Sequence, residues 1–146
     1  MAARRRSLKP GEIGETTERV LDALDPDAAD VILSFVTEPL VAPEVLAEQT
    51  RLYFKEVEAM ADDGEAIDLE LVTDLAVQCE RLLDEMDDDM PEEHQRLIEA
   101  AVRYFVDNED SDRDLDSLLG FDDDISVIET VAIAVGKEHV LERGDD

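Results

Sequence analysis

The residues with the clearest chemical potential are the carboxylates of segment 107–124, which carries nine acids and one arginine. Its alternating aspartates follow the spacing of the first three ligands of an EF-hand calcium loop, and Leu119 falls at the apolar eighth position. Carboxylate oxygens select calcium or magnesium over softer metals. The candidate metal ligands on this hypothesis are Asp112, Asp114, Asp116 and Asp123.

The same loop departs from the calcium-binding pattern at two positions. Ser117 stands at position six, where glycine makes the sharp turn of an EF-hand. Asp123 stands at position twelve, where the longer arm of glutamate chelates more readily with both oxygens. Metal binding is therefore one of three hypotheses for this segment.

The other two hypotheses are a protein contact and a structural loop. In a protein contact, exposed acids present negative charge to a basic partner. The candidate contact residues include a second acidic run near the end of an expected helix: Asp87, Asp88, Asp89, Asp112, Asp116 and Asp122. In a structural loop, aspartates cap the last helix and satisfy backbone donors, and the frequency of such caps and turns favours this role.

Catalytic side chains are sparse elsewhere in the chain. His94 and His139 lie far apart at expected helix ends, and Cys79 falls in an apolar helical pattern typical of a buried residue. The chain has no tryptophan, no glycine-rich phosphate loop and no nucleophile elbow. An exposed run of acids gives no reason to expect the separated pKa values that a catalytic pair needs. We therefore expect no enzymatic activity and no cofactor.

The net charge indicates the class of partner. The 146 residues include 41 acidic and 13 basic side chains, for a formal charge of -28. Such a charge repels nucleic-acid phosphates and anionic membrane surfaces, so we expect a protein partner with a basic surface, no direct nucleic-acid contact and no membrane association. A single cysteine and the lack of a visible signal peptide fit a reducing cytoplasm. The pattern leaves the oligomeric state open.

Regularly spaced apolar residues predict a folded core despite this charge. We expect a flexible basic arm over residues 1–14, a single helical domain over 15–140 and a disordered tail over 141–146. A hydrophobic content of 44% suits one modest core. No convincing strand-period alternation is found, so the expected fold class is all-α, a compact bundle of about five or six helices with an ordered acidic loop before the last helix.

Capping residues set the expected helix boundaries. Thr16 is the expected cap of the first helix, and Asp25 precedes a proline at the start of the second. Pro43 and Pro91 begin two longer helices, and Gly136 follows the last one. In the helix after Pro43 the apolar residues recur at spacings of three and four: Val45, Leu46, Leu52, Tyr53, Val57 and Met60. The clearest apolar stripe follows it, from Leu69 to Met86.

Around the acidic segment the chain resembles the YkvA-like family, a bacterial domain of unknown function. The resemblance covers about residues 95–135. It rests on an aromatic pair, two spaced acids, a glycine-aromatic pair and a double acid: Tyr104, Phe105, Asp110, Asp114, Gly120, Phe121, Asp123 and Asp124. The resemblance implies a helix, an ordered loop and a second helix, with a structural role for these residues rather than calcium ligation, and it implies no activity.

The chain also departs from the family pattern. Family members usually have prolines at the positions held here by Asn108, Arg113 and Ser117, and more apolar residues around them. Many members look membrane-associated, but acids replace that apolar surface here. The membrane association of the family is therefore not transferred to this chain.

Together these features predict a non-enzymatic acidic adaptor or regulatory protein that binds a basic protein surface. Its carboxylates would imitate the charge of nucleic acid, which suggests a partner within nucleic-acid machinery. The alternative is a divalent-cation module that uses residues 112–123. The arm carries Arg4, Arg5, Arg6 and Lys9, but because it is tethered to an acidic body we expect no stable nucleic-acid binding.

Overall fold

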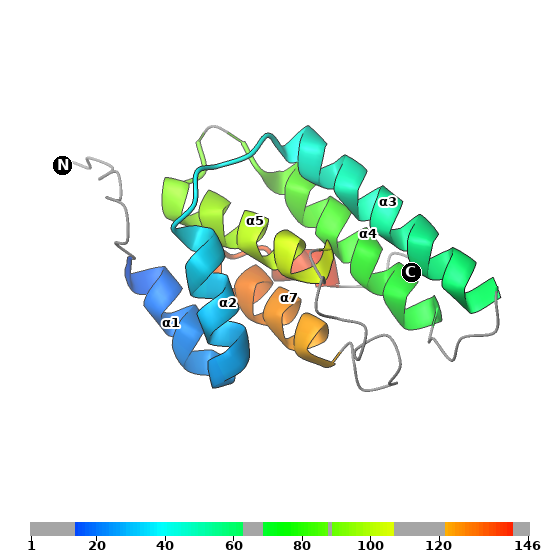
Figure 1. Ribbon diagram of the computed structural model, residues 1–146. Helices are drawn as coiled ribbons and strands as arrows, with labels where there is room; N and C mark the ends of the chain where they lie inside the picture. Colours follow the sequence, from blue (N-terminus) through cyan, green and yellow to red (C-terminus); the bar gives the residue numbers. More distant parts are fainter. Residues whose placement is uncertain (1–13, 63–68, 88, 107–121, 142–146) are drawn as a thin grey trace.

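The computed structural model describes residues 14–62, 69–87, 89–106 and 122–141. These residues form helices and contain no strand, which confirms the all-α prediction (Figure 1). Residues 1–13, 107–121 and 142–146, and with them all of the expected arm except Gly14, most of the acidic loop and most of the tail, lie outside the described part. The elements in chain order are α1 (Glu15–Ala23), α2 (Pro26–Val36), α3 (Pro43–Asp62), α4 (Leu69–Glu85), α5 (Glu92–Val106), α7 (Asp122–Ala134) and the 3-10 helix η2 (Glu138–Leu141).

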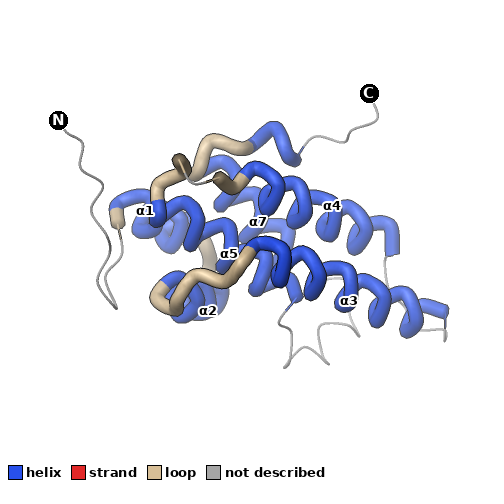
Figure 2. The backbone as a smooth tube through the Cα atoms, turned by 90° about the horizontal axis from the view of Figure 1, so that it is seen from above, coloured by secondary structure: helices blue, strands red, loops and turns tan. Residues whose placement is uncertain are grey.

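Helix α5 is the centre of the bundle. It packs against α1, α2, α3, α4 and α7, and Figures 1 and 2 show α3 and α4 on one side of it and α1 and α2 on the other. With neighbours on so many sides, α5 needs apolar residues around most of its circumference. Its fully buried side chains are Leu97, Ile98, Ala100, Ala101, Val102 and Phe105.

The stripe of α4 faces this core as the sequence predicts. Val72, Leu82 and Cys79 are fully buried, so the thiol is an apolar packing residue. Two aromatic rings join α3 to α5, because Tyr53 meets Phe105 edge to face with ring centroids 5.1 Å apart. None of the described helices has the length and apolarity needed to cross a bilayer.

Two predicted helix ends are confirmed. The Asp25 side chain accepts a hydrogen bond from the backbone N–H of Ala28 at 3.3 Å, so it caps α2. Gly136 has a φ of 78° and follows the end of α7, where the N–H of Lys137 donates to the carbonyl of Ala132 at 2.8 Å. This geometry is a Schellman motif, which satisfies a terminal carbonyl and requires a residue that tolerates positive φ.

The first helix is capped differently from the prediction. Thr16 lies inside α1, and the N-cap residue is Gly14, which makes no side-chain hydrogen bond. Instead, the Glu93 carboxylate of α5 accepts a hydrogen bond from the N–H of Thr17 at 2.6 Å. A carboxylate at a helix N-terminus also interacts favourably with the helix dipole. The acid that stabilises the start of α1 therefore comes from a distant part of the chain.

The apolar residues of α3 divide between two faces. Leu46 and Val57 are buried in the core, whereas Val45 is 46% exposed and Leu52 is 53% exposed. Residues 45 and 52 lie two turns apart and share one side of the helix, next to the buried face. The sequence pattern predicts one apolar stripe, but the structure leaves part of it uncovered.

Candidate functional site

Two charged side chains of α5 hold the connection between α2 and α3. Arg96 donates through Nη1 to the carbonyl oxygens of Val36, at 2.9 Å, and Glu38, at 2.7 Å. One turn further along, the Glu99 carboxylate accepts a hydrogen bond from the N–H of Val41 at 2.8 Å. Arg96 therefore satisfies carbonyls that the end of α2 leaves without intrahelical partners. Both contacts tie the connection to the most buried helix of the bundle.

A third side chain of α5 completes this clamp, which consists of Arg96, Glu99 and Arg103. The Arg103 guanidinium lies 2.8 Å from the Glu38 carboxylate and 4.4 Å from the centre of the Phe35 ring. The side chain is 22% exposed, so solvent screens the pair only in part. Ion pairing and a cation–π contact together fix the guanidinium over the end of α2.

Burial changes the acidity of the clamp carboxylate. Glu99 is 5% exposed, and desolvation raises its pKa, while the hydrogen bond from Val41 and the charges of Arg103 and Arg96 oppose that rise. The carboxylate is thus held in an environment that disfavours its charge. Its backbone acceptor role explains why an acid is found on the buried face of α5.

The connection, α3 and α5 surround an open groove of about 610 Å³. The connection contributes one wall and α3 the other, and the last turns of α5 form the floor. Its lining includes Leu40, Leu52, Tyr53, Glu56, Arg103 and Val106. Leu40 is 39% exposed, so apolar surface faces the groove from both walls.

Basic side chains of the described residues are mostly taken up by contacts within the fold. Besides the two clamp arginines, Lys137 lies 3.2 Å from the Glu85 carboxylate, and Arg51 lies 3.6 Å from Glu80. These cations lie on α3, on α5 and in the turn after α7, and each already contacts an acid or a carbonyl of the fold. They do not neutralise the acids of the first two helices.

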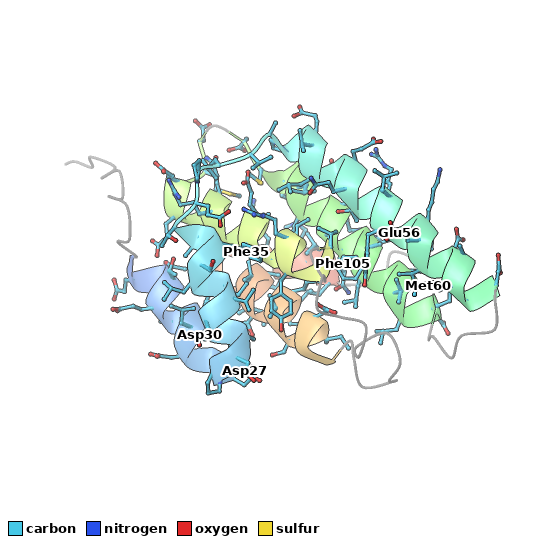
Figure 3. All side chains as sticks on the ribbon, viewed as in Figure 1. Asp27, Asp30, Phe35, Glu56, Met60 and Phe105 are labelled. Atoms are coloured by element: carbon cyan, nitrogen blue, oxygen red, sulfur yellow. The ribbon has the colours of Figure 1, made fainter. Side chains whose placement is uncertain are left out.

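Exposed acids of α1 and α2 form the acidic face, defined by Asp22, Asp27 and Asp30. None of these three carboxylates makes an ion pair with a described residue. Figure 3 labels Asp27 near the start of α2 and Asp30 further along the same helix. Arg19 lies on α1 three residues before Asp22 but forms no ion pair with it, so the acidic face presents net negative charge to solvent.

The residues predicted to contact a partner lie in different structural surroundings. Asp87 and Asp89 are exposed, but Asp87 also accepts backbone hydrogen bonds from Asp89 and Met90, at 2.9 and 3.0 Å, in the turn before α5. Asp122 is the first residue of α7. Three further predicted contact residues lie outside the described part of the chain: Asp88, Asp112 and Asp116.

The residues of the predicted structural loop are only partly described. Phe105 is fully buried, Tyr104 is half-buried, and Asp124 in the first turn of α7 is 3% exposed. Asp123 precedes it in the same turn, but its side chain is outside the described part. The remaining loop residues, Asp110, Asp114, Gly120 and Phe121, also lie outside it, as do Asp112 and Asp116 of the calcium hypothesis. No group of three potential metal ligands is found among the described residues.

The two histidines interact with neighbouring charged side chains of the fold. Burial lowers the pKa of His94, and Lys137 adds to this effect while Glu93 opposes it. His139 lies 3.0 Å from Glu85 and, together with Lys137, lowers the pKa of that carboxyl by hydrogen bonding. None of these side chains lines the groove.

The cysteine belongs to the core rather than to a reactive site. Complete burial raises the pKa of the Cys79 thiol, and the nearby charges of Asp124 and Glu80 raise it further. A thiol with a raised pKa in apolar surroundings is a poor nucleophile.

Sequence reasoning missed the clamp and the groove. The available signal was the spacing of Arg96, Glu99 and Arg103, which fall at i, i+3 and i+7 within a helix that otherwise buries apolar residues. That spacing places three charges along one side of α5, where they need specific partners. A second signal was the excess of apolar residues on α3 over the number that one face can bury.

No protein-family model, curated protein or solved structure matches this chain. The YkvA-like resemblance therefore stays a prediction from the residues between 104 and 124. The candidate site is defined by its own geometry, which combines the acidic face, the clamp and the groove.

Proposed function

We propose that this protein is a non-enzymatic acidic adaptor or regulator that binds a basic protein surface. The observation that carries the proposal is the unequal use of charge in the described fold. Its cations mostly bind acids and carbonyls within the bundle, whereas Asp22, Asp27 and Asp30 remain exposed without an ion pair to a described residue. The surface field is therefore strongly negative.

A field of this kind favours one class of partner. It attracts basic protein surfaces and raises their rate of association, and it repels nucleic acid. A protein that itself binds nucleic acid has such a basic surface, so components of nucleic-acid machinery are suitable partners. The contact would weaken as salt screens the charges.

Co-purification from the native host at rising ionic strength tests this proposal. The informative variant carries Asp22→Asn, Asp27→Asn and Asp30→Asn on the acidic face. Its matched control, Glu44→Gln with Glu58→Gln and Glu70→Gln, removes the same charge from exposed positions on α3 and α4.

The parent and the control should retain basic partners at low salt and lose them as salt rises. The acidic-face variant should lose them at a lower salt concentration. Partners that survive high salt unchanged, or that the two variants retain equally, would contradict the proposal.

The cation-binding alternative concerns residues 112–123 and is tested separately. Calorimetry with calcium and magnesium on the metal-free protein should show no heat of binding if the segment serves a structural or protein-contact role. Saturable binding below roughly millimolar metal would instead support the cation module.

A further inference from the structure

The groove beside α3 exposes apolar surface that no described residue covers. Leu52 and Leu40 face it from opposite walls and are 53% and 39% exposed, and Tyr53 and Val106 contribute further apolar surface below them. Scattered apolar residues on a protein surface need no explanation. Apolar side chains that line one concave site indicate binding.

Its shape is set before any partner arrives. The clamp residues Arg96, Glu99 and Arg103 fix the wall that carries Leu40, because they bind the backbone or side chains of residues 36–41. The opposite wall is joined to the floor by the contact between Tyr53 and Phe105. A preformed site reduces the ordering cost of binding.

The described lining includes an exposed acid, and the acidic face lies on another part of the bundle. Glu56 belongs to the α3 wall, and Asp27 and Asp30 lie on α2, on the other side of α5 (Figure 3). The one cation among the described lining residues, Arg103, is already paired with Glu38. A segment that enters the groove therefore meets apolar side chains, the Glu56 carboxylate and the negative field of a chain with a net charge of -28.

This charge decides between the possible occupants. A second copy of the chain would bring another net charge of -28, and nucleic acid or an anionic membrane would likewise be repelled. A basic amphipathic helix satisfies both features, since its apolar stripe fills a groove and its lysines or arginines are attracted by Glu56 and by the negative field of the chain. We infer that the groove binds a basic amphipathic helix of a partner protein, an inference that rests on the proposed function and names its site.

Two synthetic peptides of about 18 residues test the inference. One carries leucine at i, i+3, i+4 and i+7 and lysine elsewhere, and the other replaces each leucine by alanine at the same charge. Fluorescence anisotropy should show the leucine peptide binding at least roughly tenfold more tightly, because burial of apolar side chains adds to a shared charge attraction.

Substitutions on the two walls locate the binding. Leu40→Ser with Leu52→Ser should reduce the affinity for the leucine peptide to that for the alanine peptide. The control, Val31→Ser with Ile133→Ser, changes side chains that are 40% and 59% exposed outside the groove and should leave the affinity unchanged. Circular dichroism and a thermal melt should match the parent for both variants, since all four positions are exposed.

The experiments give different results if the groove is not the binding site and if the proposed function is wrong. The groove would not be the binding site if both peptides bound equally and with the same salt sensitivity. The same would follow if the leucine peptide still bound tightly after the Leu40 and Leu52 changes. Either result would leave the proposed function standing. If neither peptide bound at low salt, both proposals would be wrong.

Other occupants are also distinguishable. Sedimentation that shows a dimer of the parent, dissociated by the Leu40 and Leu52 changes, would identify a second copy and overturn the inference. Serine in place of Leu115, Leu118, Leu119 and Phe121 should leave peptide affinity unchanged. A large gain in affinity would instead identify the chain's own acidic segment as the occupant.

Discussion

Charges in the clamp and charges on the acidic face have opposite uses in the same small bundle. In the clamp, Arg96 and Glu99 are largely buried and bind defined backbone groups of the α2–α3 connection. On the acidic face, Asp27 and Asp30 are exposed on α2 and pair with no described cation. Charged residues therefore stabilise the fold in the clamp, whereas on the acidic face they produce a negative electrostatic potential at the surface.

The physical difference lies in solvation. A buried charged group whose partner is removed leaves an unsatisfied polar group, which destabilises the fold strongly. An exposed acid is solvated and screened, so its removal costs little stability and here relieves repulsion. Mutations in the clamp should therefore change the stability of the fold, whereas mutations in the acidic face should change binding.

Truncation of Arg96 should have the largest effect. Arg96→Ala removes donors from the carbonyls of Val36 and Glu38 and an ion pair with Glu92, at a side chain that is only 16% exposed. We expect a loss of about 3 kcal/mol in the free energy of unfolding, measured by urea denaturation.

The matched control for that change is Arg51→Ala. The Arg51 side chain is 59% exposed and its ion pairs span 3.6 Å or more. It should cost less than about 1 kcal/mol, as exposed pairs do. Equal losses for the two arginines would contradict the structural role of the clamp.

Removal of the charge of Glu99 should change how stability depends on pH. Because the folded pKa is raised above its ordinary value, the folded parent binds a proton more readily than the unfolded chain. The parent is therefore favoured below the ordinary pKa of about 4.5 and loses that advantage as pH rises through the raised folded value.

Glu99→Gln keeps the shape and removes this titration. Its unfolding free energy should lie within about 1 kcal/mol of the parent's at pH 7, and its stability relative to the parent should decline toward pH 4. Denaturation at both pH values measures the difference. The substitution Glu58→Gln at an exposed position serves as control. The same pH trend in that variant would show that burial of Glu99 is not the cause of the trend.

Neutralisation of the acidic face should have the smallest effect on stability. Asp27→Asn with Asp30→Asn should leave the unfolding free energy within about 0.5 kcal/mol of the parent or raise it slightly. The thermal midpoint at low salt measures this change. A destabilisation above about 2 kcal/mol would show that these acids stabilise the fold, as the clamp residues do.

Local features of the fold were accessible from the sequence because they depend on neighbouring residues. Asp25 with Pro26, Gly136 and the buried Cys79 all lie where capping chemistry and apolar periodicity place them. The start of α1 was assigned wrongly because its acceptor, Glu93, lies 76 residues from Thr17.

The candidate site was less accessible, because it depends on which helix covers which face. Periodicity groups Val45 and Leu52 with the buried residues of α3, but it does not say that none of the described helices packs over them. The clamp contacts join α5 to residues about sixty positions earlier in the chain. Such contacts leave no local pattern beyond the presence of charges on an apolar helix.

The most direct test of the account is nuclear magnetic resonance of the labelled protein titrated with the leucine–lysine peptide. The account predicts amide shift changes concentrated at Leu40, Leu52 and Glu56, with little change at Ile133 on α7. Rising salt should weaken the titration without moving the affected positions, because charge strengthens the contact while the groove locates it. Shift changes spread evenly over the exposed acids, or absent from the groove at low salt, would contradict it.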